Sequence, residues 1–230
     1  AIAKLKTTGG IIQLSDGTFT FNGEVQFTSG SASTDYSGIT IRGAGMNATT
    51  LSGDLGASIY NCFFDIRGGS SGATTTGFTI SDLTMDTTSG TTTHNAISLA
   101  GYNNLDWFRF ERIRFIDDNA SSVTLGLDNV NNSKKYVVIK DCEFFGNADN
   151  QYAIVMKKVD HAWVTGCYFY QADGTSYNAL AIYGDSHHIV VKDNVFKGLW
   201  GHTPISVSGS SYVTISGNLI EAARCGDAAD

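Results

Sequence analysis

The sequence predicts an all-β protein built as a solenoid, a parallel β-helix with three short strands per coil, and two observations carry this prediction. The first is composition: charged residues make up 16% of the 230 residues, and the chain has 26 Gly and a single Pro. Such a chain lacks the Ala, Leu, Glu and Lys content from which long helices are built. The second is a repeat of apolar residues every 24 to 30 residues, a spacing typical of stacked solenoid coils.

The first ladder of the repeat comes from six segments that superpose along the chain. Each segment alternates apolar and polar residues and then breaks at a small or polar pair, a pattern that indicates strand, tight turn, strand. The equivalent apolar residues, separated by 30, 29, 25, 27 and 24 residues, are Ile80, Phe110, Ile139, Val164, Val191 and Ile215.

A second ladder lies between the segments of the first and has the same period. Its equivalent residues, at steps of 28, 29, 26 and 25, are Leu99, Leu127, Met156, Ile182 and Val207. A single coil cannot bury its inward side chains alone, so we expect stacking of coils to supply the core. An irregular β-sandwich remains the alternative, because its turn signals recur at similar intervals.

Charge and cysteine spacing exclude several classes of function. The net charge of −7 argues against a nucleic-acid partner, because neutralising phosphates needs an excess of Lys and Arg. No run of eighteen apolar residues occurs, so we expect no membrane partner. The four cysteines, Cys62, Cys142, Cys167 and Cys225, lack the spacing of a structural zinc site.

Two early segments carry a family resemblance. GGIIQLSDGTFTF at 9–21 and GITIRGAGMNATTL at 38–51 resemble the first coils of right-handed β-helix proteins of the pectin lyase-like superfamily, and the later repeats resemble their ordinary coils. The resemblance implies a right-handed solenoid with Asn residues stacked at the short turn, where Asn194 and Asn218 lie. It leaves the reaction open, since the scaffold carries lyases, hydrolases, esterases, epimerases, adhesins and tailspikes.

We therefore predict one right-handed β-helix domain of about eight coils over residues 1–230. Residues 1–35 form the first coils and part of a cap, 36–222 form the regular coils, and 223–230 are a tail that we expect to be a truncated end. Cys142 and Cys167 share the Asn column in adjacent coils, about one strand spacing apart, which favours two buried thiols over a disulfide.

The candidate catalytic residues lie on the outer face of the first sheet, where relatives of this type bind polysaccharide. Parity along the second ladder places Asp128, Lys157 and Tyr183 outward on three successive coils. A uronate lyase needs a base for the proton alpha to the carboxyl group and a donor for the leaving oxygen, roles that suit Lys157 and Tyr183, with Asp128 orienting the sugar. The alternative is an exposed Asp128–Lys157 pair with a bystander tyrosine.

The candidate substrate-binding residues surround this column and carry charge, an imidazole or an aromatic ring for stacking on sugars. They are Arg67, Lys158, His161, Asp185, His187, Tyr152, Tyr177, Trp200 and His202.

Loop residues near the candidate catalytic column could bind a metal, and the alternative is that they only form turns. Asp160, His161, His187 and His188 could act as acid or base or ligate a metal, but such residues are more often turn formers, so we expect no metal site. Oxygen ligands at 117–119 lack the EF-hand spacing. We therefore expect no required cofactor and retain Ca²⁺ as an option.

The function that these features favour is a polysaccharide-active or polysaccharide-binding β-helix that is secreted or displayed on a cell or virion surface. A lyase is favoured over a hydrolase, because the paired carboxylates of an inverting hydrolase are not on the predicted face. Whether the chain is an enzyme stays open. The alternative is a non-catalytic surface protein, namely an adhesin, a structural solenoid or a tailspike, and a tailspike would be a homotrimer.

Overall fold

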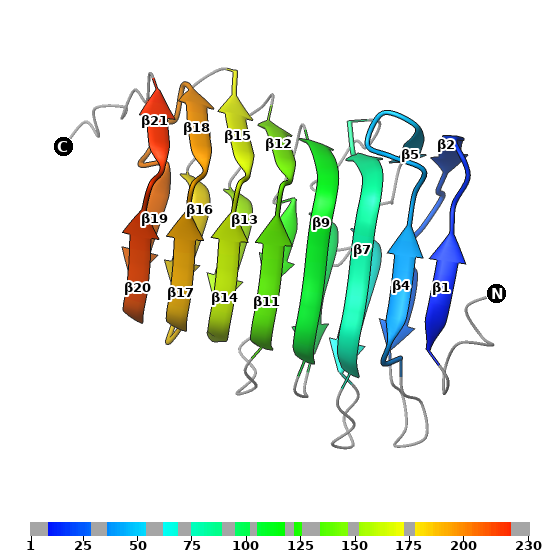
Figure 1. Ribbon diagram of the computed structural model, residues 1–230, viewed down its shortest axis with the longest axis horizontal. Helices are drawn as coiled ribbons and strands as arrows, with labels where there is room; N and C mark the ends of the chain where they lie inside the picture. The colour runs from blue at the N-terminus through cyan, green and yellow to red at the C-terminus, as the bar shows by residue number, and fades with distance from the viewer. Residues whose placement is uncertain are drawn as a thin grey trace.

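The computed structural model is an all-β parallel solenoid (Figure 1). It describes residues 9–28, 36–53, 62–68, 75–88, 95–101, 105–117, 122–125, 134–146, 152–172 and 178–221. In these ranges every regular element is a strand. No helix in this part of the chain is long and apolar enough to cross a membrane.

The strands form two parallel sheets. The seven-stranded sheet, which corresponds to the first sheet of the sequence analysis, contains β3 (Val25–Thr28), β6 (Cys62–Gly68), β8 (Asn95–Gly101), β10 (Val123–Leu125), β13 (Tyr152–Lys157), β16 (Asn178–Tyr183) and β19 (Ile205–Ser208). In the 14-stranded sheet, one row contains β1 (Gly10–Gln13), β4 (Ile39–Arg42), β7 (Thr75–Asp86), β9 (Leu105–Asp117), β11 (Lys134–Lys140), β14 (Val159–Thr165), β17 (His187–Lys192) and β20 (Ser211–Ser216). The second row adds β2 (Gly17–Thr20), β5 (Thr49–Ser52), β12 (Glu143–Gly146), β15 (Tyr168–Gln171), β18 (Val195–Gly198) and β21 (Leu219–Glu221).

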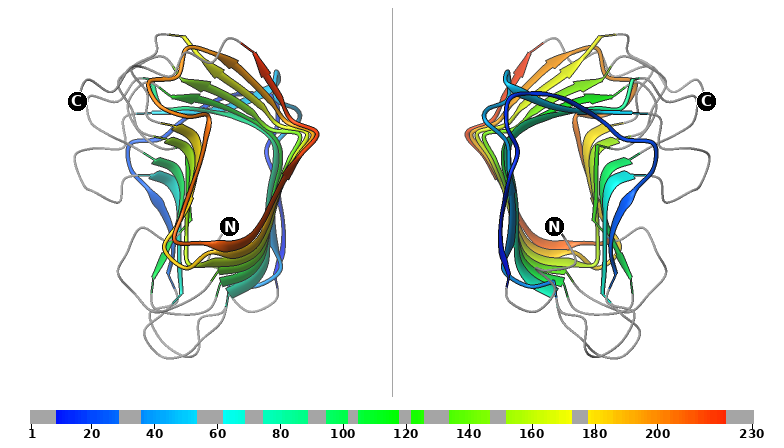
Figure 2. Two further views of the ribbon diagram at one scale, coloured as in Figure 1. Left: turned by 90° about the vertical axis from the view of Figure 1, so that its left-hand side faces the viewer. Right: turned by 90° about the vertical axis from the view of Figure 1, so that its right-hand side faces the viewer.

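The two long strands β7 and β9 join the two rows of the larger sheet. They have 12 and 13 residues and pair with both rows, whereas later coils divide the same path into two short strands. The end-on views show the rows meeting at a corner while the seven-stranded sheet closes another side (Figure 2). The predicted pattern of three separate short strands per coil therefore does not hold at β7 and β9. The count of eight coils stays a prediction.

The strand register confirms the first ladder and corrects the second. Ile80, Phe110, Ile139, Val164, Val191 and Ile215 pair in succession. In the smaller sheet Leu125, not Leu127, pairs with Leu99 and Met156. Alternation cannot distinguish two leucines that lie two residues apart, since both face the same side of a strand.

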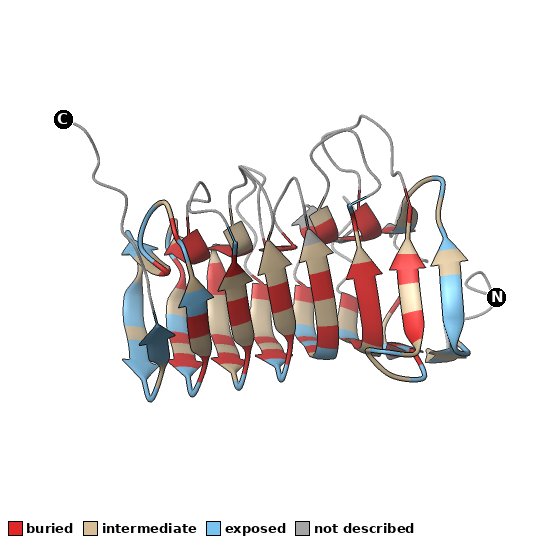
Figure 3. Ribbon diagram, turned by 90° about the horizontal axis from the view of Figure 1, so that it is seen from above, coloured by how far each residue is buried: buried red, intermediate tan, exposed pale blue. Residues whose placement is uncertain are grey.

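Stacked apolar side chains fill the inside of the solenoid. Phe115, Phe144, Phe169 and Phe196 are buried and pair along the second row, with ring centroids 4.8, 4.7 and 4.6 Å apart and nearly parallel planes. Burial decreases toward the ends of the solenoid (Figure 3), where β21 is exposed along its length.

A column of Cys and Asn residues lines the corner between the two rows. Asn194 accepts the Cys167 N–H at 2.8 Å with its Oδ1, and its Nδ2 donates to Asn218 Oδ1 at 2.9 Å. This confirms the predicted Asn stack and the place of the cysteines in it. Cys142 and Cys167 are buried free thiols, and burial together with the neighbouring Cys167 raises the pKa of Cys142.

Candidate functional site

A column of aromatic side chains runs along the outside of the larger sheet, one residue per coil. Its members precede the core residue of each strand by three positions and are Trp107, Tyr136, His161, His188 and Tyr212. All five have a positive φ, between 55° and 62°. They occupy one register position that the ladder skips on both strands of each pair, since the residues on either side are paired and these five are not.

The rings of this aromatic column stack on one another. Centroid distances along it are 4.2, 5.3, 4.5 and 5.0 Å, and three of the four pairs are close to parallel. A left-handed backbone costs a non-Gly residue about 1–2 kcal/mol, and each stacked pair returns about 0.5–1.5 kcal/mol. Stacking therefore offsets the backbone strain for rings inside the column, whereas each end ring has one face without a ring partner from the column.

Glycines continue the column beyond Trp107. Gly77, Gly38 and Gly9 have φ of 70°, 68° and 64° in the preceding coils. A Cβ built on Gly77 would meet, among the residues that the structure describes, only backbone atoms of Gly38, the nearest at 3.6 Å. The space above Gly77 is therefore open next to the free face of Trp107, whose side chain is 60% exposed.

Polar groups border this open space. Asp106 precedes Trp107, and its Oδ1 is buried without a hydrogen-bond partner among the described residues. Burial raises the pKa of Asp106, while the cation of Lys135 acts in the opposite direction. Thr76 pairs with Asp106 in the register and lies just before Gly77 on its strand. Arg109 is exposed and lies two residues after Trp107, on the other side of the Gly77–Trp107 level. The arrangement combines a flat ring face with hydrogen-bonding groups.

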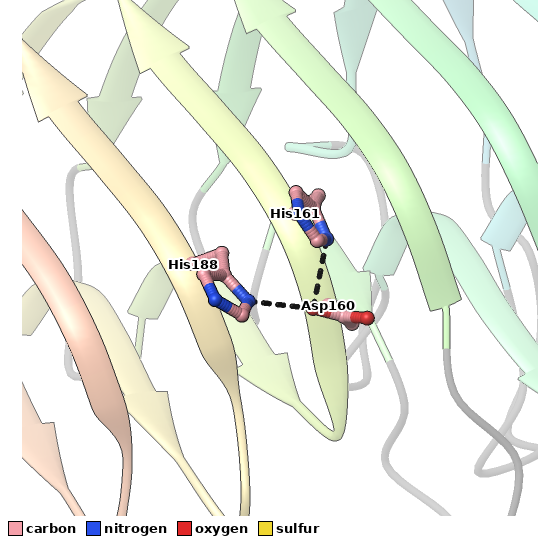
Figure 4. Close-up of side chains that lie close together, drawn as sticks. All are labelled: Asp160, His161 and His188. Atoms are coloured by element: carbon pink, nitrogen blue, oxygen red, sulfur yellow. Dashed lines mark hydrogen bonds and ion pairs between the residues drawn. The ribbon is translucent and has the colours of Figure 1, made fainter.

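Asp160 holds the two imidazoles of the aromatic column together (Figure 4). Its Oδ1 lies 2.9 Å from His161 Nδ1 and 3.1 Å from His188 Nδ1. Burial by itself would raise the pKa of Asp160, but the hydrogen bond with His188 and the charges of His161 and His188 lower it. The carboxylate is therefore ionised near neutral pH.

Two of the three predicted catalytic residues lie side by side on the smaller sheet. Lys157 and Tyr183 are register partners at the ends of β13 and β16, and both are half-buried. Burial, together with Tyr152, raises the pKa of Tyr183. The phenol is therefore protonated near neutral pH and is a weaker acid than an exposed tyrosine.

The third predicted catalytic residue does not belong to this pair by register. The pairing of Leu125 with Met156 shifts the register by two residues from the one that placed Asp128 beside Lys157, while the parity is unchanged. Asp128 itself lies outside the described residues, as do Tyr177 and the side chain of Arg67. The backbone of Arg67 pairs with Ala100, in the expected column.

The smaller sheet offers less open surface than the sequence suggests. The second outward column of this sheet is buried at Ser98, Thr124, Val155 and Ala181. Trp200, predicted as an exposed stacking ring, is only 3% exposed and packs with the core. It cannot take part in stacking on a sugar, because its ring face already contacts protein.

The remaining predicted binding residues occupy turns and strand ends. Lys158 and Asp185 have positive φ and their backbone N–H groups donate to Gly184 and Gly209, as expected of turn formers. His187 Nδ1 lies 2.6 Å from Ser211 Oγ, and His187 is not one of the three residues whose ligand atoms gather at Asp160, although it pairs with Asp160 in the register. Tyr152 is half-buried at the start of β13, and His202 is exposed.

Comparison with known proteins identifies the fold family. A family model described as a right handed beta helix region matches residues 69–228. The chain belongs to this family. The right-handed beta helix is of the pectin lyase-like type, as the sequence predicts. A search of curated proteins found no match.

Solved structures similar to this right-handed beta helix are distant in sequence. ORF18 of Geobacillus virus E2 is 13% identical with a TM-score of 0.33, over 93% of this chain and 54% of that chain. The chain thus spans about half the length of the viral protein. The A-modules of the Azotobacter vinelandii mannuronan C-5 epimerases AlgE6 and AlgE4 are each 11% identical, with TM-scores of 0.30 and 0.31, over 93% of this chain and 91% and 89% of theirs.

The aromatic column was missed from the sequence, although a signal for it was present. Aligned repeats place a ring three residues before the core residue in five successive coils, from Trp107 before Phe110 to Tyr212 before Ile215. Alternation places this position on the outer face, three residues from an inward one, but it does not show that the outward rings of successive coils stack on one another.

Proposed function

We propose that this right-handed beta helix binds a polysaccharide, with one sugar ring stacked on the free face of Trp107 above Gly77. The observation that carries the proposal is the 60% exposure of Trp107 beside an open glycine position. Sugar rings present flat C–H faces that pack on indole, and burying them removes apolar area from water. The sugar thereby extends the aromatic column by one level.

The polar groups around this position favour hydroxyl-rich ligands. Thr76 and Arg109, on either side of the Gly77–Trp107 level, offer a hydroxyl and a guanidinium to sugar hydroxyls. The cation nearest to the open face, Arg109, is paired with Glu111. Together with a net charge of −7, this favours neutral sugar units over a polyanion.

Replacing Trp107 by Ala should abolish most of the glycan affinity. We expect at least tenfold weaker binding in isothermal titration with the best ligand of a panel of neutral and acidic polysaccharides, because the stacking face is lost. In the unsubstituted protein the same ligand should shift the tryptophan fluorescence to shorter wavelength as indole leaves water. Far-UV circular dichroism should be unchanged, since Trp107 is outside the core.

Two further variants show whether binding occurs at this end of the column. Gly77→Tyr places a ring over Trp107 and should block the ligand, since the next five positions already accept aromatic residues with positive φ. Tyr212→Ala removes an equally exposed ring at the other end and should bind as the unsubstituted protein does. Equal affinity in Trp107→Ala and Tyr212→Ala would refute the proposed position.

A second candidate function is cleavage of a uronate polysaccharide, and the register of Lys157 with Tyr183 favours it. In this proposal Lys157 removes the proton alpha to the carboxyl group and Tyr183 protonates the leaving oxygen. A tyrosine phenol carries its proton near neutral pH, so Tyr183 can act as the donor, although its raised pKa makes it a weaker acid.

Cleavage is tested by the absorbance of unsaturated uronate in a panel of pectin, alginate and glycosaminoglycans. We expect Lys157→Ala and Tyr183→Phe each to lower the rate at least a hundredfold, the range of a lost general acid or base. Lys192→Ala, an exposed residue at the end of β17 in the larger sheet, serves as the control. Glycan binding without any absorbance change would instead support a non-catalytic surface protein.

The proposal also covers the location of the protein, its partner and its oligomeric state. We propose a polysaccharide partner outside the cell or on a virion surface, with about eight coils in one domain. Ca²⁺ would then be an accessory ion for an acidic glycan, and a homotrimer would mark a tailspike. Sedimentation analysis with and without Ca²⁺ distinguishes these arrangements.

A further inference from the structure

We propose that Asp160, His161 and His188 form a binding site for a divalent transition metal of the zinc class. One carboxylate oxygen and two imidazole nitrogens lie within 4.8 Å of one another on β14 and β17. This site is independent of the glycan proposal, because it uses different side chains at another level of the column.

Ligand spacing is the first argument for the site. Two ligands at the usual bond lengths of tetrahedral zinc are about 3.3 Å apart. Asp160 Oδ1 is 2.9 Å from His161 Nδ1 and 3.1 Å from His188 Nδ1, close to that separation. Metal binding then requires mainly that the two imidazoles turn toward each other, since their rings already stack with centroids 4.5 Å apart.

Unsatisfied hydrogen bonding is the second argument. His161 Nδ1 is buried and has no hydrogen-bond partner of good geometry among the described residues, although Asp160 Oδ1 is near. A buried nitrogen in this state gains a partner when a cation binds between the three ligand atoms. The strained, positive φ of His161 and His188 brings both side chains to the same outer face.

Charge and accessibility support an open site. Lys135 faces Asp160 from β11, and His187 faces it from β17. Lys135 also pairs with Asp106, and its charge lowers the pKa of Asp106, whereas the groups that lower the pKa of Asp160 are His161 and His188. The side chain of His188 is 48% exposed, which leaves coordination positions for water. Two nitrogens and one carboxylate suit Zn²⁺, Co²⁺, Ni²⁺ or Cu²⁺ and not Ca²⁺.

The test is a zinc titration of the full chain after chelator treatment, carrying Cys225→Ser and a purification tag without histidine. We expect one Zn²⁺ per chain, and at least tenfold weaker binding in His188→Ala and in Asp160→Asn. His187→Ala is the matched control, because this adjacent imidazole contacts Ser211 instead, and it should bind within twofold of the unsubstituted protein.

A second readout keeps the test decisive if one variant folds poorly. Co²⁺ should give a visible absorption band in the unsubstituted protein and in His187→Ala, and this band should be lost in His188→Ala. Excess Ca²⁺ should not displace it. Absence of stoichiometric zinc binding, or equal affinity in His187→Ala and His188→Ala, would overturn the site.

Discussion

Phe169→Ala is expected to lower the free energy of unfolding by about 3–5 kcal/mol, the cost of truncating a buried aromatic residue. Phe169 is fully buried and stacks on Phe144 and Phe196 on its two sides, at 4.7 and 4.6 Å. Its removal opens a cavity that the neighbouring coils cannot close, because their backbone spacing is set by the strand ladder. Urea denaturation followed by circular dichroism measures the loss.

Tyr170→Ala is the matched control for this prediction. Tyr170 is the next residue on β15, is only half-buried and faces outward. We expect a loss below about 1 kcal/mol, in line with a surface substitution away from the core. Equal losses for the two variants would mean that the phenylalanine stack does not carry the stability of this row.

Asn194→Ala is expected to cost about 2–4 kcal/mol, although it removes only a small polar side chain. Asn194 is buried, and it accepts the Cys167 N–H at 2.8 Å and donates to Val164 O at 2.9 Å. Alanine leaves that N–H and that carbonyl without these partners, and each unsatisfied buried group costs about 1–3 kcal/mol. Thermal and urea unfolding measure the change.

Asn218→Ala tests whether burial explains the size of this effect. Asn218 occupies the same column one coil later and makes an equivalent bond to Val191 O at 2.9 Å, but it is half-exposed. Water can replace its hydrogen bonds, so we expect a clearly smaller loss. If Asn218→Ala were as destabilising as Asn194→Ala, desolvation of the column could not be the cause.

The fold was largely predictable because each repeat shows a local alternation of apolar and polar residues. Inward residues such as Phe110 and Ile139 must be apolar in every coil, and the stacking of identical coils turns that requirement into a period. Where the prediction failed, at Leu127, two leucines with the same parity competed for one place. Only the pairing of Leu125 with Met156 decides between them.

The candidate site was predictable in part. Lys157 and Tyr183 follow core residues of one ladder, so their juxtaposition follows from the period. Trp200 was wrongly expected at the surface, because the exposure of a ring after a strand depends on how the chain turns over the core. Trp107 has outward parity by alternation from Phe110, but its stacking partner in the next coil is set by the register between coils, which alternation does not show.

The sequence by itself determined the class of fold, the first ladder and the Asn and Cys column, because these depend on which side chains can be buried at a fixed spacing. The tertiary structure alone decided which outward residues meet. His161 and His188 are 27 residues apart in the chain, yet Asp160 contacts both, and Trp107 faces an open glycine position in the preceding coil. Such contacts depend on the register between coils, which a local pattern does not encode.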